Sequence, residues 1–228
     1  MKKMFCTLAL AAASFGALAQ TAPAPTPAAP AGYSAQLGPL VAQVTATGDA
    51  AELRALASKL ERAAAAAPTD WLPRYYQAYA LTVSAFQAEE PGSAKDKVLD
   101  QAEAALAQAG KLKGDESELL ALHAYIYQGR LTISPMERGQ EYSELIAGAV
   151  GQAEALNPAN PRPYLIQANT LYYTPAEFGG GPAAAKGLYD TAKAKFAAFR
   201  PASALAPNWG ERQLLGRLQQ YAPVQAAK

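Results

Sequence analysis

The chain has 228 residues, with 20 Lys and Arg, 19 Asp and Glu, one His and one Cys, and its formal net charge is +1 at pH 7. Alanine is abundant and β-branched residues are sparse, so the composition favours an all-α protein over a β architecture. The near-neutral charge offers no basic field to nucleic acid. One His and one Cys are too few for a His/Cys metal site or a Cys–His catalytic pair, and we expect no cofactor.

The first 19 residues have the pattern of a secretory signal peptide. Two lysines follow the initiator, an apolar stretch runs from residue 4 to 18, and small residues precede a cleavage site after Ala19. Cys6 lies inside the apolar stretch, so the cleaved chain has no cysteine and forms no disulfide bond. We expect export to the periplasm or beyond the cell. No later stretch has the roughly 18 apolar residues that cross a bilayer, so no transmembrane anchor is expected.

A Pro- and Ala-rich stretch, residues 20–33, follows this leader. Proline removes backbone donors and favours polyproline II conformation, so we expect a disordered spacer here. Between residues 34 and 222, apolar positions recur at helical spacing in segments separated by Pro, Gly, Asp and Asn, which predicts a helical domain with a flexible tail at 223–228. In chain order, the apolar positions of the nine expected helices span residues 37–44, 53–64, 71–83, 98–106, 119–127, 142–156, 164–172, 188–199 and 209–218.

Polar residues mark the starts of two of these helices. Asp49 precedes the second helix and is expected to cap it. Ser134 is followed by Pro135 at the first helical position and by Glu137 in the first turn, so Ser134 is the expected N-cap of the sixth helix.

The helices repeat in pairs. Small residues in tyrosine-rich helices, Ala78, Ala124 and Ala168, recur at about 45-residue intervals. A helical hairpin of this length cannot bury its apolar face alone, so neighbouring hairpins stack into a solenoid with one curved surface. The sequence predicts an α-solenoid of four antiparallel helix pairs and a C-terminal capping helix.

One segment resembles the tetratricopeptide repeat. Ile146, Val150, Ala153 and Pro158 follow the spacing of the second helix of that family, and Tyr164 and Ala168 begin the next first helix. From about residue 35 the chain is also similar to a group of exported bacterial tetratricopeptide proteins. The period differs, about 45 residues rather than 34. The resemblance implies that the first helix of each pair lines a concave groove that binds extended or helical peptide segments.

No stretch pairs a nucleophile with a base, so no residue is assigned a catalytic role. His123 is interpreted as a packed or groove-edge histidine. The run Gly179–Gly181 is open to two interpretations, an anion-binding loop or a tight turn between helices. Because no Lys-Ser/Thr pair follows the glycines, we favour the turn, with Phe178 packed into the core.

The candidate partner-binding residues follow from the resemblance. If Ala168 packs inside its pair, the neighbouring turns face the groove, where Arg162 suits a carboxylate and Asn169 a peptide backbone. The full candidate set is Arg162, Asn169, Tyr172, Tyr125, Gln128 and Tyr79.

Two functions fit this arrangement. The favoured one is a non-enzymatic, exported scaffold that binds protein or peptide partners in the cell envelope through the concave groove. The alternative is a periplasmic carrier that holds a small ligand or solute in an aromatic-lined pocket. A carrier should show a cavity on the order of several hundred Å³, whereas a scaffold leaves an open groove.

Overall fold

The structure is a computed structural model, and it describes residues 32–221. The predicted signal peptide, nearly all of the spacer and the tail lie outside the described residues. Residues 32–221 form nine α-helices and one 3-10 turn with no strand, so the all-α prediction is confirmed. None of these helices is long and apolar enough to cross a bilayer. The elements are α1 Tyr33–Ala46, α2 Ala50–Ala66, α3 Leu72–Gln87, α4 Gly92–Lys111, α5 Glu116–Ile133, α6 Pro135–Leu156, α7 Arg162–Tyr173, η1 Ala176–Phe178, α8 Pro182–Ala198 and α9 Glu211–Gln219.

One of the two predicted helix caps forms. An Asp49 side-chain oxygen accepts a hydrogen bond from the backbone N–H of Glu52 at 2.7 Å, which satisfies a donor at the start of α2. Ser134 stands at the cap position of α6, but its hydroxyl donates to the carboxylate of Glu137 at 2.8 Å and bonds no helix N–H. The start of α6 therefore relies on Pro135, which has no N–H to satisfy, and on the acidic side chain in the first turn.

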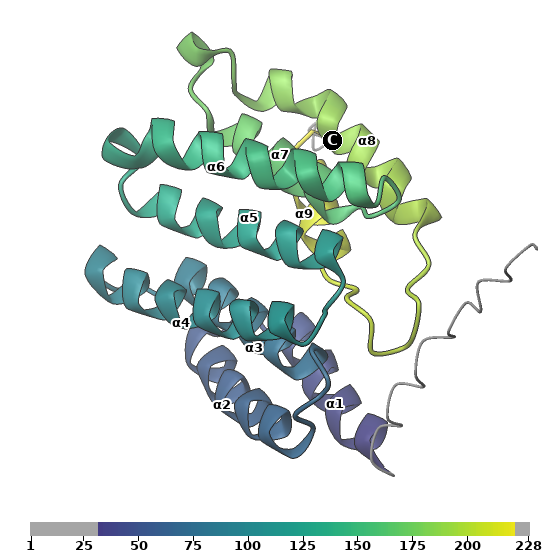
Figure 1. Cartoon of the computed structure of the whole chain (residues 1–228). Coiled ribbons are helices and arrows are strands. Elements are labelled where there is room, and N and C mark those ends of the chain that lie inside the picture. The colour runs from purple at the N-terminus through teal and green to yellow at the C-terminus, as the bar shows by residue number, and fades with distance from the viewer. Residues whose placement is uncertain (1–31, 222–228) are drawn as a thin grey trace, which may run out of the picture.

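The first eight helices form four antiparallel pairs, stacked from α1 and α2 at one end of the molecule to α7 and α8 at the other (Figure 1). The first helices of the pairs contact one another in order, α1 with α3, α3 with α5 and α5 with α7, so they form one continuous layer. Ala78, Ala124 and Ala168 lie in this layer and are fully buried, as their spacing predicts. Their small side chains allow neighbouring helices to approach closely.

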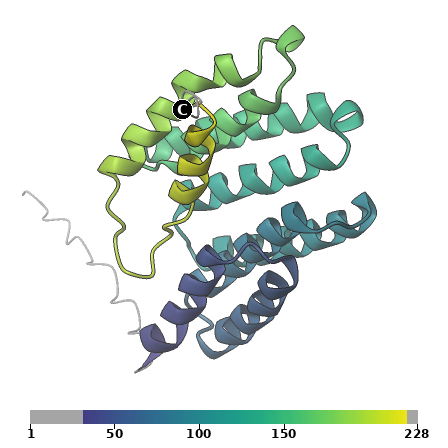
Figure 2. The same cartoon turned by 180° about the vertical axis from the view of Figure 1, so that it is seen from behind.

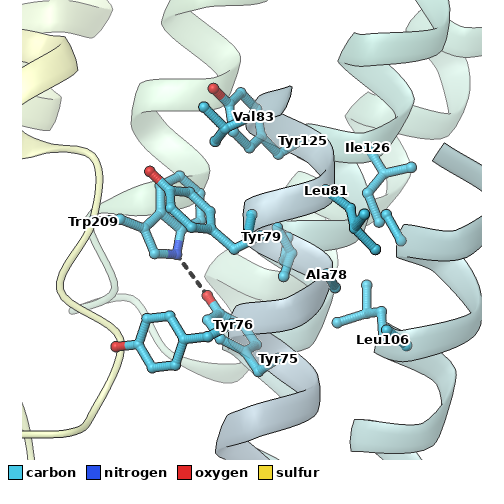
Figure 3. Packing of buried hydrophobic residues seen from close by; sticks show 14 of the residues in the cluster. Tyr75, Tyr76, Ala78, Tyr79, Leu81, Val83, Leu106, Tyr125, Ile126 and Trp209 are labelled. Atoms are coloured by element: carbon cyan, nitrogen blue, oxygen red, sulfur yellow. Dashed lines mark hydrogen bonds between the residues drawn. The ribbon is translucent and has the colours of Figure 1, made fainter. Parts of the chain in front are cut away.

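The buried apolar side chains form two groups. The larger group extends from α1 to α7 and contains the fully buried tyrosines Tyr75 and Tyr76 (Figure 3). The smaller group joins α7, α8 and α9 through Leu165, Phe196 and Leu214.

The C-terminal part of the chain does more than cap the last pair. After α8 the chain runs back along the molecule to α1 and α3, and α9 then rises beside α5 and α7 (Figures 1 and 2). We call residues 199–221 the C-terminal strap. At the far end of its path, the Leu205 side chain lies against Gly38 of α1. The strap thus lies across the layer formed by the first helices, on the face where the sequence predicts an open groove.

Candidate functional site

Trp209 fastens the strap to the helical layer. Its side chain is only 2% exposed and packs beside two tyrosines, with ring centroids 4.9 Å from Tyr79 and 5.3 Å from Tyr125 and planes inclined by 28° and 18°. Phe86 continues the column beyond Tyr125 at 4.9 Å. The indole Nε1–H donates to the Tyr75 hydroxyl oxygen at 2.8 Å (Figure 3). The Trp209 ring is therefore buried, stacked and hydrogen-bonded at the point where the strap meets the layer.

A buried ion pair holds the strap next to Trp209. Arg162, at the start of α7, is completely buried, and its Nη1 donates to Oε1 of Glu118 on α5 at 2.7 Å. Its Nη2 donates to the backbone carbonyl of Pro207 in the strap. Burial raises the pKa of the Glu118 carboxyl to about 7, although the Arg162 guanidinium opposes the rise. The pair therefore connects α5, α7 and the strap inside the protein.

Further side chains bind the strap through its backbone. The Tyr76 hydroxyl lies within hydrogen-bond distance of the carbonyl oxygens of Leu205, at 3.2 Å, and Ala206, at 3.0 Å. At the end of α1, Arg212 of the strap donates to the carbonyl oxygen of Ala46 at 2.7 Å. Residues 205–207 have no regular secondary structure and are held by side chains of the layer, much as a bound peptide would be.

A hollow of about 330 Å³ lies between the strap and the helical layer. Strap residues 208–213 form one wall. Tyr79, Val83 and Gln87 of α3 form the other wall, together with residues at the end of α1. Arg212 contributes a cationic group to the hollow and Glu211 an anionic one, and Tyr79 and Trp209 contribute aromatic rings. The volume lies within the range of small-molecule pockets, so the hollow is the candidate ligand site.

A second depression, of about 580 Å³, lies where the start of α5 meets the end of α6. Its apolar lining comes from Leu119, Leu120, Ala155 and Leu156. Its polar lining residues, Glu116 and Gln152, are exposed to solvent. It has no aromatic lining and is open, so it is the weaker candidate despite its larger volume.

Three of the predicted site residues lie under the strap. Arg162, Tyr79 and Tyr125 are brought together there, and all three are buried. The Tyr125 hydroxyl also accepts a hydrogen bond from Gln213 of the strap at 3.1 Å. This differs from the open groove that the sequence predicts, because the chain's own C-terminal segment covers these side chains.

The other three candidates take part in helix packing. Gln128 is buried and donates to the carbonyl oxygen of Ile166 at 2.8 Å, which ties α5 to α7. Asn169 accepts a hydrogen bond from the Tyr189 hydroxyl at 2.7 Å, between α7 and α8. Tyr172 donates to Gln220 at 2.8 Å, at the end of the strap. A partner-binding role for these residues stays a prediction.

The glycine-rich run forms a turn, as favoured, but the expected position of Phe178 is wrong. Phe178 is 76% exposed because it ends the 3-10 turn η1 and Gly179 then takes a left-handed φ of 80°. The backbone N–H groups of Gly179, Gly180 and Gly181 donate to carbonyl oxygens of the same turn and of α7. All three donors are used internally, so the run is no anion-binding loop.

His123 packs against an aromatic ring, as interpreted. Its ring centroid lies 4.3 Å from that of Tyr127 in a stacked arrangement, and burial lowers its pKa. His123 does not line the hollow. Within residues 32–221, no group of three or more His, Cys, Asp or Glu side chains is placed to hold a metal ion.

Trp209 and the strap are the part of the site that sequence reasoning missed. The sequence assigned Trp209 only to the apolar face of the ninth helix. The sequence does contain a signal for the strap, since Trp209 follows a segment that contains Pro201 and Pro207. Such a segment cannot continue a helix and has to run over the surface of the protein.

Comparison with solved structures links the chain to one binding protein. The HusA haemophore from Porphyromonas gingivalis superposes with a TM-score of 0.74 at 34% sequence identity, over 86% of this chain and 96% of that one. No protein-family model and no curated protein matches the chain.

Proposed function

We propose that this chain, which belongs to the same family as the HusA haemophore, is an exported, non-enzymatic carrier for a planar aromatic molecule of the haem class. The observation that carries the proposal is the likeness to a haemophore over nearly that protein's whole length, at 34% identity. The alternative from the sequence, a small-ligand carrier, thereby takes precedence over the peptide-binding scaffold. The helix pairs are proposed to be tetratricopeptide-like.

The hollow has groups that suit such a ligand. Tyr79 and Trp209 line the hollow, but each ring is stacked on the other and nearly fully buried, so a flat conjugated molecule gains a full ring face only when the indole moves away. Arg212 uses one nitrogen for the Ala46 carbonyl, which leaves its remaining N–H groups as donors for a carboxylate of the ligand. These features support recognition of the ring and its acidic groups.

The residues that line the hollow support ligation of iron less well than they support contact with the ring and its acidic groups. The only histidine of the chain, His123, packs on Tyr127 and does not line the hollow. Burial raises the pKa of the Tyr79 hydroxyl well above its ordinary value, which opposes the phenolate form that would ligate iron. We therefore expect stacking and charge pairing to supply most of the affinity.

The test is a titration of residues 20–228 with haemin, followed by the absorbance of haemin and by quenching of tryptophan fluorescence. We expect saturable binding with one site. Arg212→Glu should weaken the affinity about tenfold, since it replaces a charge-assisted hydrogen bond by repulsion. Arg200→Glu is the matched control, because Arg200 is exposed and does not line the hollow, and it should bind haemin as the native chain does.

Absence of saturable haemin binding would overturn the proposal. Equal affinities for the native chain and Arg212→Glu would leave the carrier function in place but remove the hollow as its site. Retention of a peptide in place of haemin would return the scaffold to first place.

A further inference from the structure

The hollow exists only while the strap is in place. Residues 208–213 supply one wall and the α3 and α1 residues supply the other, so movement of the strap away from the layer removes half of the lining. The site is therefore assembled from two parts of the chain that are far apart in sequence and joined by non-covalent contacts.

The first half of the strap has little structure of its own. Residues 199–210 contain no helix, and residues 200–204 are exposed. This half is held mainly by side chains of the layer: the Tyr76 hydroxyl, the Arg162 guanidinium, and the tyrosines around Trp209. These contacts can break while the hydrogen bonds within α1–α8 stay intact. A segment of this kind opens at a lower free energy than the whole protein unfolds.

Opening would expose a surface that suits the same class of ligand. Trp209 covers the rings of Tyr79 and Tyr125, which are 4% and 8% exposed when it is docked (Figure 3). Removal of the indole frees one face of each ring next to the hollow. The closed form then shields a bound molecule, and the open form gives it a path in or out.

From these contacts we propose that the C-terminal strap is a gate, which undocks as a unit from the layer while α1–α8 stay folded and thereby admits and releases the ligand of the hollow. The assignment of a ligand rests on the proposed function, whereas the undocking of the strap does not. The two can be tested separately.

Tyr76→Phe is the variant that tests the gate. It removes the hydroxyl that bonds the Leu205 and Ala206 carbonyls but keeps the ring, and Tyr76 does not line the hollow. Tyr164→Phe is the matched control, because its hydroxyl bonds the Pro158 carbonyl at 3.3 Å, away from the strap. Leu205→Ala is a second variant, which weakens the contact of the strap with α1.

Hydrogen exchange without ligand tests the undocking. Amides of α9 should exchange faster than those of α3 in the native chain, and Tyr76→Phe should speed α9 exchange by about fivefold, the equivalent of one lost hydrogen bond, with α3 unchanged. Leu205→Ala should act in the same direction, and Tyr164→Phe should have no effect. Equal exchange of α9 and α3, changed together by Tyr76→Phe, would overturn the gate.

Stopped-flow release of haemin tests the passage of ligand. Tyr76→Phe should raise the dissociation rate by the same factor as it raises α9 exchange. An unchanged rate, with α9 exchange accelerated, would overturn the gate and leave the carrier function standing. Failure of haemin to bind, with the exchange result as expected, would overturn the proposed function and leave the undocking of the strap established.

Discussion

Replacement of Arg162 by methionine should destabilise the protein strongly, although arginine is ordinarily a surface residue. Arg162 is completely buried and pairs with Glu118 at 2.7 Å, while Glu118 is itself only 7% exposed on its side chain. Arg162→Met keeps much of the volume but leaves the carboxylate buried without a counter-charge, and the Pro207 carbonyl loses its donor. Removal of one partner of a buried pair costs about 3–5 kcal/mol of the free energy of unfolding.

Urea unfolding at pH 8, followed by circular dichroism, measures this loss. In thermal unfolding of Arg162→Met, the same loss should lower the melting temperature by roughly 6–20 °C for a domain of this size. The matched control is Lys186→Met, which breaks the pair with Asp190 at 2.7 Å. Both of those side chains are about one-half exposed, so the loss should stay near or below about 1 kcal/mol. A loss for Arg162→Met no larger than that of the control would refute the idea that a buried ion pair holds the strap.

Three further predictions concern individual residues. Burial raises the pKa of the Glu118 carboxyl to about 7, so between about pH 5 and 7 the folded chain holds a proton on Glu118 that the unfolded chain has released. The stability that this group contributes therefore falls as pH rises, by up to about 1 kcal/mol per pH unit. Urea titrations across this range should show that Glu118→Gln lacks this component of the slope. Ala168→Leu should cost about 1–3 kcal/mol in the same assay, since the site is fully buried, and a neutral result would place it outside the core. Gly210→Ala should lower the melting temperature, because φ is 109° there and the added Cβ would lie 2.8 Å from Phe196. Gly216→Ala, on the same strap but with open space around it, should instead be neutral or raise the melting temperature, and equal behaviour of the two variants would contradict the argument from backbone conformation.

Local sequence signals predicted the helices well. Asp49 caps α2 because its partner lies three residues away, and the buried alanines follow from spacing within and between neighbouring hairpins. Phe178 was wrongly placed in the core because an aromatic next to glycines gives no measure of where a 3-10 turn will direct it.

The strap could not be predicted in the same way because its contacts are non-local. Trp209 bonds Tyr75 across 134 residues, and Arg162 meets Glu118 across 44. No periodicity within one helix reports on such pairs. Arg162 was therefore assigned, from the tetratricopeptide resemblance, to an open groove, where a charged residue is ordinarily solvated.

The path of the strap also changes how the stack of helix pairs unfolds. In an open stack each pair contacts only its neighbours, so the terminal pairs fray first and unfolding can begin at either end. Here Leu205 and Arg212 attach to α1, while Leu214 packs between α7 and α8. The first and last pairs are thus joined through the strap, and the linear array becomes a closed circuit of contacts. While that circuit is intact, neither end can fray without disturbing the other, so fraying of either terminal pair requires that the strap undock first.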